Sequence, residues 1–306
     1  MKPPAFAYHR PGSVAEAVET LAELGADGKV LAGGQSLVPV LNMRLAAPAA
    51  LVDINRLGAE LAFVETTADR VRVGALARHA QTERDEAAFA ALPLLRQATR
   101  HVAHQTIRNR GTTVGSIVHA DPAAELPAVL MLCDGVMELS SADGARSVPA
   151  ADFFLGPLES ALSYGELALA ATFSLPPPRT GSAWVEVSRR AGDYALCGLG
   201  LTVTLDEDRR ICQARAAYIS VGPTPMLVDL TDAVAGQPPD AADWSAAAAL
   251  AAARVDPDED IHATADYRRH LVGVLTSRAG RAASAHAARA APAPAAPAVA
   301  AEEVSG

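Results

Sequence analysis

The chain has 306 residues, enough for two domains or one large one with a substantial core. Hydrophobic residues make up 50% of it and the mean hydropathy is +0.14, but alanine supplies much of this, and no apolar stretch approaches the ~20 residues that a membrane-spanning helix requires. The formal charge of −9 argues against nucleic acid as the main partner.

The termini and the cysteines exclude further classes. The first six residues lack the apolar segment of a secretory signal, so a cytoplasmic location is expected. Cys133, Cys197 and Cys212 lie far apart, with no C-x-x-C pair and no histidine at metal-ligand spacing. We therefore expect three buried free thiols, and neither a structural zinc nor a four-cysteine iron–sulfur cluster held by this chain alone.

Residues 1–55 predict a β-α-β start. Ser13 and Glu16 form a capping box, apolar residues recur at helical spacing as far as Leu24, and Gly25 ends the helix. A turn then leads into an apolar strand that ends at Gly33, and a further strand is predicted at residues 51–54.

The first glycine stretch combines features of an anion site. Gly33 and Gly34 allow positive φ and let a ligand approach the backbone, Gln35 adds a donor, and Ser36 is a candidate N-cap for a helix over residues 37–45. A strand, a glycine turn and a helix start together point successive N–H groups at one place. An ordinary strand-to-helix turn remains the alternative for such a stretch taken alone.

A second glycine stretch, residues 110–116, lies in the next region. We expect paired strands at residues 61–64 and 71–73, helices at 86–102 (interrupted at Pro93) and 126–133, a hairpin of 136–139 with 145–148, and a strand at 167–175. The polar segment 101–116 predicts a functional loop because of its length and its donors. Two donor-rich loops suit a ligand with two phosphates and a long body.

Three prolines at residues 176–178 predict a domain boundary. Beyond them, strands at 182–188, 195–205 and 211–221 and helices at 243–253 and 261–278 predict a small α+β domain with a three-stranded antiparallel sheet. We thus divide the chain into residues 1–175 (subdomains of about 1–55 and 56–175), residues 179–280, and an Ala/Pro-rich tail over 281–306 that is expected to be disordered.

Four motifs resemble one family in order and separation. Residues 32–37 (Ala-Gly-Gly-Gln-Ser-Leu) look like the first flavin-binding motif of the medium subunit of molybdenum hydroxylases, such as aerobic carbon monoxide dehydrogenase and xanthine dehydrogenase. Residues 107–116 are similar to the second motif, residues 121–127 continue it, and residues 188–195 resemble a later family segment. The resemblance runs from about residue 6 to residue 278.

The resemblance implies an α+β chain: a two-lobed FAD-binding fold of the vanillyl-alcohol-oxidase (PCMH) type, followed by the small C-terminal α+β domain. It implies noncovalent FAD, with the pyrophosphate at the first motif, the second loop as the other wall, two carboxylates near flavin hydroxyl or N–H groups, and a tyrosine against the isoalloxazine ring. The implied FAD-binding residues are Ala32, Gly33, Gly34, Gln35, Ser36, Leu37, Thr112, Gly115, Ser116, Asp121, Glu125 and Tyr194.

The implied function is that of an oxidoreductase subunit. It would pass electrons from the [2Fe-2S] clusters of a small subunit to an external acceptor, such as NAD⁺, a quinone or a carrier protein. A large subunit would hold the molybdenum cofactor, in a heterotrimer that pairs into a dimer of heterotrimers. Neither nucleic acid nor a membrane span is expected. The alternatives are a self-sufficient flavin-dependent oxidoreductase and a flavin-free scaffold subunit.

One residue departs from the family pattern. Val114 stands where the family usually has glycine, and a valine forced into positive φ would be strained by on the order of 1 kcal/mol or more. This position is the only one that favours the scaffold alternative. The histidines His79, His101, His104 and His119 are interpreted as hydrogen-bonding partners rather than acids or bases.

Overall fold

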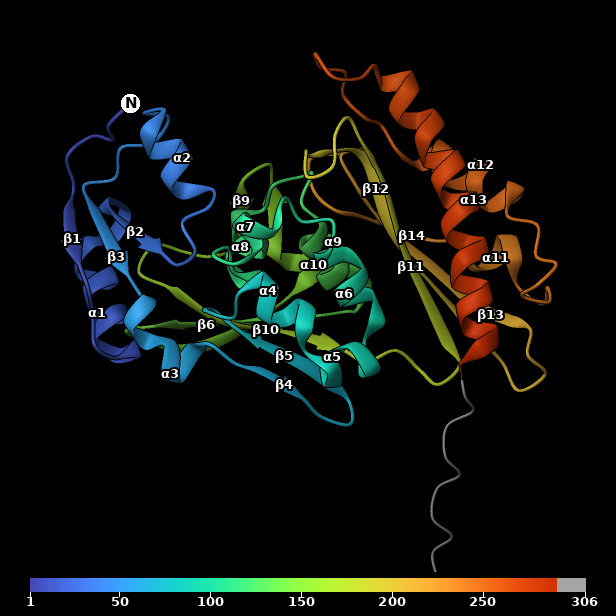
Figure 1. The fold of residues 1–306 in the computed structure, drawn as a ribbon, viewed down its shortest axis with the longest axis horizontal. Helices are drawn as coiled ribbons and strands as arrows, with labels where there is room; N and C mark the ends of the chain where they lie inside the picture. Colours follow the sequence, from blue (N-terminus) through green and yellow to red (C-terminus); the bar gives the residue numbers. More distant parts are fainter. Residues whose placement is uncertain (291–306) are drawn as a thin grey trace, which may run out of the picture.

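A computed structural model describes residues 1–290, and Figure 1 shows its three larger sheets side by side along the molecule. They have three, five and four strands, and a two-stranded hairpin adds to the middle of the molecule. The chain forms the three-stranded sheet first, then the five-stranded sheet and last the four-stranded sheet.

The first sheet is parallel, in the order β1-β3-β2, and comes from the first 53 residues. Its strands are β1 (Ala7–His9), β2 (Gly28–Leu31) and β3 (Ala50–Asp53), and its helices are α1 (Val14–Leu24), α2 (Leu37–Asn42) and, after the last strand, α3 (Gly58–Leu61). The predicted β-α-β start is confirmed. Ser13 Oγ accepts a hydrogen bond from the Glu16 N–H at 3.2 Å, and Gly25, with φ +53°, ends α1.

The middle sheet is antiparallel, in the order β4-β5-β10-β6-β7. Its strands are β4 (Val64–Thr66), β5 (Arg70–Gly74), β6 (Val136–Ser141), β7 (Gly144–Pro149) and β10 (Leu167–Ser174), while β8 (Phe154–Gly156) and β9 (Glu159–Ser160) form the hairpin. The strand pair, the hairpin of β6 with β7 and the strand at the end of this region are confirmed, although residue 61 belongs to α3 rather than to β4.

Seven helices of the described chain lie between β5 and β8 (Figure 1). They are α4 (His79–Arg84), α5 (Glu86–Ala91), α6 (Pro93–Thr99), α7 (Gln105–Arg108), α8 (Thr113–His119), α9 (Glu125–Leu132) and α10 (Ala150–Phe153). The predicted helix over residues 86–102 is broken at Pro93, which starts α6 because its missing N–H has no intrahelical role at a first helical position. The segment 101–116, predicted as a loop, instead contains α7 and the start of α8.

The C-terminal sheet has four antiparallel strands, so the predicted three-stranded sheet is wrong by one edge strand. The strands are β11 (Thr180–Ser188), β12 (Ala195–Leu205), β13 (Ile211–Ile219) and β14 (Met226–Asp229). The strand β14 has only four residues and follows two prolines, Pro223 and Pro225, so its sequence reads as a turn. Cys133 and Cys197 are buried as expected, but Cys212 on β13 is exposed because alternate strand residues face opposite sides.

Helices cover one face of this sheet, as expected, and the long helix α13 crosses it in Figure 1. The helices are α11 (Thr231–Val234), α12 (Ser245–Arg254) and α13 (Ala265–Arg289). Disorder was predicted from residue 281, but α13 continues to Arg289 with Ala283 and Ala287 buried against β11, so that start is wrong. The rest of the predicted tail lies outside the described residues.

The opposite face of the C-terminal sheet packs on α6 and α9. Trp184, Ala217 and Ile219 from this sheet join the same buried apolar cluster as the core of the middle sheet. A second cluster lies between the sheet and α11–α13. Both faces of the sheet are therefore buried by apolar contacts, which fixes its position against the rest of the chain. Among the described helices, none is long and apolar enough to cross a membrane.

The packing of α13 on Trp244 gives a test of this core. A methyl group at residue 280 would lie 2.1 Å from Trp244 Cδ2, and the tryptophan is 1% exposed and has no room to move. Gly280→Ala is expected to lower the free energy of unfolding by about 1–3 kcal/mol through overpacking, although alanine favours a helix. Gly58→Ala in α3 is the control, because nothing lies near its added methyl. Equal denaturation midpoints for the two variants would contradict this packing.

Candidate functional site

The first glycine stretch joins β2 to α2. Gly34 has φ +71°, a conformation that glycine adopts without strain, and the Gln35 side-chain amide donates to Gly33 O at 3.1 Å. Within residues 1–290, the backbone N–H groups of residues 33–36 donate no hydrogen bond. Ser36 occupies the N-cap position but makes no side-chain cap, and α2 ends at Asn42, so the helix is shorter than predicted.

The second glycine stretch enters α8 through a side-chain cap. The buried Thr112 hydroxyl accepts a hydrogen bond from the Gly115 N–H at 3.1 Å. Thr112, one of the predicted site residues, is therefore the N-cap of α8. A Cβ at Gly115 would lie 2.5 Å from that hydroxyl, so the cap needs glycine there. Val114 lies inside α8, is buried and has no positive φ, so the strain considered for it is absent and the scaffold alternative loses its only support.

The two stretches lie directly against each other. A Cβ at Gly33 would lie 2.5 Å from Arg110 O and 2.8 Å from Gly111 Cα. Any side chain at Gly33 would therefore push the second stretch away from the first. The two predicted glycine stretches therefore meet at Gly33, next to the N–H groups of residues 33–36 that donate no hydrogen bond within residues 1–290.

Two residues that the sequence analysis missed hold this contact together. Arg78 Nη1 donates to Arg110 O at 2.5 Å in the second stretch, and Arg78 Nη2 donates to Asn55 Oδ1 at 2.7 Å. The Asn55 side-chain amide then donates to Ala32 O at 2.9 Å in the first stretch. One guanidinium and one amide therefore bridge the two glycine stretches, and no local sequence signal marks either residue.

The Arg78 charge has no carboxylate within ion-pair distance in the part of the chain that the structure describes. Burial and the nearby Arg110 charge lower the pKa of Arg78, although an arginine remains protonated at any ordinary pH. A bound anion would offset both effects. Unused N–H groups, amide and hydroxyl donors and a guanidinium without an ion-pair partner in the described chain therefore fit a diphosphate at this site.

His79 packs against Gly111 of the second stretch. Its backbone N–H donates to Gly111 O at 3.0 Å, and a Cβ at Gly111 would lie 2.9 Å from the His79 ring. The ring is 3% exposed and its Nδ1 has no hydrogen-bond partner among the described residues. Burial lowers the pKa of His79 to about 4, so the ring is neutral at physiological pH and acts as a packing group.

The remaining predicted residues lie farther along the chain, near the C-terminal sheet. Asp121 Oδ1 accepts from the Ala123 N–H at 2.8 Å in the turn before α9, and Glu125 is the first residue of that helix. Burial, then the charges of Glu186 and Asp121, raise the pKa of Glu125 to about 8. Tyr194, from the loop between β11 and β12, is 67% exposed, and partial burial with the Asp121 and Glu125 charges raises its pKa.

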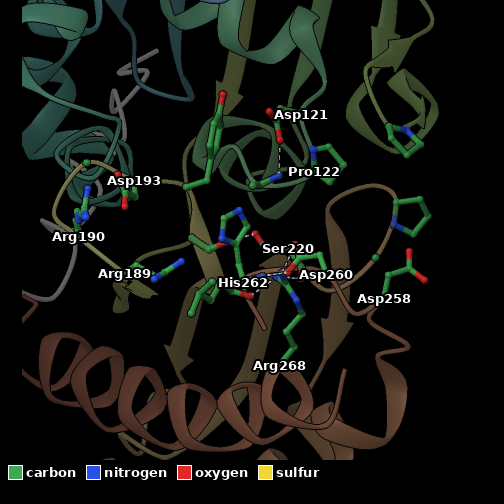
Figure 2. A pocket seen from close by; sticks show the side chains of 18 residues that line it. Asp121, Pro122, Arg189, Arg190, Asp193, Ser220, Asp258, Asp260, His262 and Arg268 are labelled. Carbon is green, nitrogen blue, oxygen red and sulfur yellow. Dashed lines mark hydrogen bonds and ion pairs between the residues drawn. The ribbon is translucent and has the colours of Figure 1, made fainter. Parts of the chain in front are cut away.

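A cavity of about 840 Å³ adjoins Asp121 and Tyr194 and includes no residue of the two glycine stretches (Figure 2). Figure 2 shows Asp121 on one wall and Arg189 and Arg190 on the loop after β11. Arg268 of α13 fixes the opposite side, because its guanidinium donates to Leu196 O, to Ser220 O and to Asp260 Oδ2, the last at 2.8 Å.

Comparisons with known proteins match this arrangement over most of the chain. Residues 4–177 match the model described as FAD binding domain in molybdopterin dehydrogenase, and residues 182–283 match the CO dehydrogenase flavoprotein C-terminal domain. The chain is 38% identical to the 6-hydroxypseudooxynicotine dehydrogenase complex subunit alpha of Paenarthrobacter nicotinovorans, over 91% of this chain and 94% of that protein. It is 34% identical to the carbon monoxide dehydrogenase medium chain of Afipia carboxidovorans, over 93% and 99%.

A solved structure shows the same fold. Quinoline 2-oxidoreductase from Pseudomonas putida 86 contains a chain that is 34% identical and superposes with a TM-score of 0.88, covering 94% of this chain and 99% of that one. The fold and the two matched domains define an FAD-binding protein. The chain belongs to the family of FAD-binding medium subunits of molybdenum hydroxylases, and it is an oxidoreductase subunit.

The neutral His79 gives a pH test of the site. An unfolded histidine titrates near 6.5, whereas folded His79 titrates at about 4. Between these values the unfolded chain holds a proton that the folded chain lacks, so this contribution is fully present above pH 6.5 and is lost as the pH falls toward 4, by about 3 kcal/mol in all.

The measurement is the free energy of unfolding as a function of pH. The slope of this free energy against pH reports how many more protons the unfolded chain binds than the folded chain. Between pH 6.5 and 4 that number is expected to be smaller by about one in His79→Gln than in wild type, whatever the absolute loss of stability. A slope unchanged by the substitution would show that His79 titrates normally.

Proposed function

We propose that this chain binds FAD noncovalently and passes electrons from the [2Fe-2S] clusters of a small subunit to an external acceptor. A large subunit would hold the molybdenum cofactor, and the three chains would form a heterotrimer that pairs into a dimer of heterotrimers. The observation that carries the proposal is the contact of the two glycine stretches, where the N–H groups of residues 33–36 donate no hydrogen bond and Arg78 has no ion-pair partner within residues 1–290. The relatives' names support partners, because they are named as subunits or chains of dehydrogenases.

Each group of residues takes a part in this proposal. Residues 32–37 would hold the pyrophosphate, with the unused N–H groups of residues 33–36 as donors and Thr112, Gly115 and Ser116 as the other wall. Asp121 and Glu125 would accept from, or donate to, polar atoms of the flavin, and the exposed face of Tyr194 would shield the ring. We also propose the boundary at residues 176–178, between β10 and β11, as the division between the FAD-binding and C-terminal domains.

When bound, FAD supplies redox chemistry that converts single-electron input into transfer to an acceptor. This chain's own contribution is to bind the cofactor, to orient it between the glycine stretches and the C-terminal sheet, and to surround it with groups of set charge. A self-sufficient flavin oxidoreductase would differ in one observable respect: the isolated chain would reduce its flavin with its own small substrate.

The visible absorption spectrum of the purified chain tests the proposal, before and after acid precipitation. Flavin bands that pass into the supernatant are expected. Bands that remain in the pellet would indicate covalent attachment, and a colourless chain that takes up no added FAD would overturn the proposal. Added small-subunit clusters, rather than organic substrates, should then reduce the bound flavin.

The bridge through Arg78 predicts a specific loss of affinity. Arg78→Met removes both hydrogen bonds and the charge that faces the diphosphate, so the FAD dissociation constant is expected to rise by roughly tenfold or more, from charged hydrogen bonds of about 1.5–3 kcal/mol. Flavin fluorescence titration of the apoprotein measures it.

Arg70→Met is the matched control for this prediction. Arg70 is exposed and pairs only with the adjacent Asp69 among the described residues, away from both glycine stretches. The FAD dissociation constant of Arg70→Met should equal that of wild type. If Arg78→Met also binds FAD normally while its thermal unfolding is unchanged, the bridge has no part in cofactor binding.

A further inference from the structure

A buried carboxylate anchors the bridge that Arg78 and Asn55 form between the two glycine stretches. Asp53 is the last residue of β3 and is 7% exposed. Its Oδ1 accepts from the Asn55 backbone N–H at 2.9 Å and from the Asn55 side-chain amide at 2.6 Å, and its Oδ2 accepts from the Tyr8 hydroxyl of β1. Both oxygens are therefore engaged, and one of them holds the same amide that contacts Ala32 and Arg78.

Asp53 is ionised in the folded chain. Its burial alone would raise the pKa of the carboxyl, but the hydrogen bonds from Tyr8 and Asn55 outweigh burial and bring the pKa below its ordinary value. A carboxylate only accepts hydrogen bonds, whereas a protonated carboxyl could also donate one. Asp53 therefore offers acceptors alone to the Asn55 amide.

The two neighbours of the Asn55 amide fix its orientation. A guanidinium only donates hydrogen bonds, so Arg78 Nη2 requires the amide oxygen, at 2.7 Å. The Asp53 carboxylate requires the amide NH₂ group, which also donates to Ala32 O at 2.9 Å. A rotated amide would turn its NH₂ group toward the guanidinium and its oxygen toward the carboxylate, and neither contact would be a hydrogen bond. Asp53 thus determines which end of the amide Arg78 meets.

We propose that Asp53 is a positioning residue for FAD binding, which holds the Arg78 guanidinium at the junction of the glycine stretches by way of the Asn55 amide. Arg78 donates two hydrogen bonds within residues 1–290, one to Asn55 and one to Arg110 O, and a guanidinium has five N–H groups. The remaining groups are available to the diphosphate. This inference rests on the proposed function, because the proposed function assigns the diphosphate to this junction.

Three roles of Asp53 predict three different effects on FAD affinity. A carboxylate that acts only through its charge repels the diphosphate, so its removal would tighten binding. A carboxylate that only stabilises the parallel sheet would change the stability and leave the affinity of the folded chain as it is. Removal of a positioning carboxylate would weaken binding, although the site then loses a negative charge.

The first measurement compares Asp53→Ala with Asp53→Asn in the full chain, by flavin fluorescence titration of the apoprotein. Asp53→Ala leaves the Asn55 amide free to rotate, so the FAD dissociation constant is expected to rise by roughly threefold to tenfold, as for the loss of about one hydrogen bond of Arg78. Asp53→Asn retains an oxygen for Asn55 and can turn its NH₂ group toward the Tyr8 oxygen, which can accept. It is expected to bind FAD at least as tightly as wild type. A folded Asp53→Ala chain with wild-type or tighter affinity would overturn the proposal.

Asp229→Ala is the matched control. Asp229 Oδ1 accepts from the Thr231 N–H at 2.8 Å, the same local contact that Asp53 makes with the Asn55 N–H, but it lies on β14 of the C-terminal sheet. This variant should bind FAD as wild type does. Thermal unfolding of every variant reports stability separately from affinity.

Asn55→Ala keeps the proposal testable if Asp53→Ala does not fold. It removes the amide and retains the carboxylate, so Arg78 loses the same hydrogen bond and the dissociation constant is expected to rise by the same factor. A folded Asn55→Ala chain that binds FAD normally would remove the link through which Asp53 is proposed to act.

The second measurement is a double-mutant cycle with Arg78→Met. If Asp53 acts through Arg78, Asp53→Ala should have no further effect on the FAD dissociation constant of the Arg78→Met chain, because the guanidinium that it positions is gone. A merely structural role gives no such dependence. Equal factors with and without Arg78 would show that the two residues act independently, and the proposal would be wrong.

The outcomes separate this inference from the function on which it rests. A wild-type chain that takes up no FAD removes the proposed function before any variant is compared. A wild-type chain that binds FAD, together with a folded Asp53→Ala chain of unchanged affinity, would leave the proposed function intact and overturn the role of Asp53 alone.

Discussion

The contact between Gly33 and the backbone at Arg110 and Gly111 is the constraint on which the site depends. With the Cβ position of Gly33 only 2.5 Å from Arg110 O, the first stretch can meet the second only as bare backbone. The contact brings together one strand end of the parallel sheet and one helix start of the middle region, and Arg78 and Asn55 hold it with hydrogen bonds to both sides. At this junction the backbone N–H groups of residues 33–36 donate no hydrogen bond within residues 1–290.

Features set by neighbouring residues could be predicted from the sequence. The Ser13 cap, the end of α1 at Gly25 and the hairpin of β6 with β7 each depend on a few adjacent side chains. The two glycine stretches could be recognised for the same reason, and so could the break at Pro93. In each case, the conformation is dictated locally and tertiary packing agrees with it.

Features set by distant contacts could not be predicted from the sequence. Arg78 and Asn55 are ordinary polar residues in sequence, and only the fold places them between two loops. The end of α13 reads as a featureless alanine-rich run, yet Gly181 of β11 lets it pack so closely that a Cβ there would lie 2.1 Å from Ala287 N. The edge strand β14 was missed because its prolines resemble a turn, and Val114 raised a strain that its helical position removes.

The contact of the C-terminal sheet with α6 and α9 combines apolar packing with buried polar groups. Trp184 fills the apolar cluster shared with the middle sheet, and its indole N–H also holds the Glu186 carboxylate. Glu125, at the start of α9, lies on the same side of the sheet, and its burial, followed by the charge of Glu186, raises its pKa and favours its neutral form. Purely apolar residues in place of Glu186 would hold the C-terminal sheet against the rest of the chain at least as firmly, so stability alone does not explain a buried carboxylate at this contact.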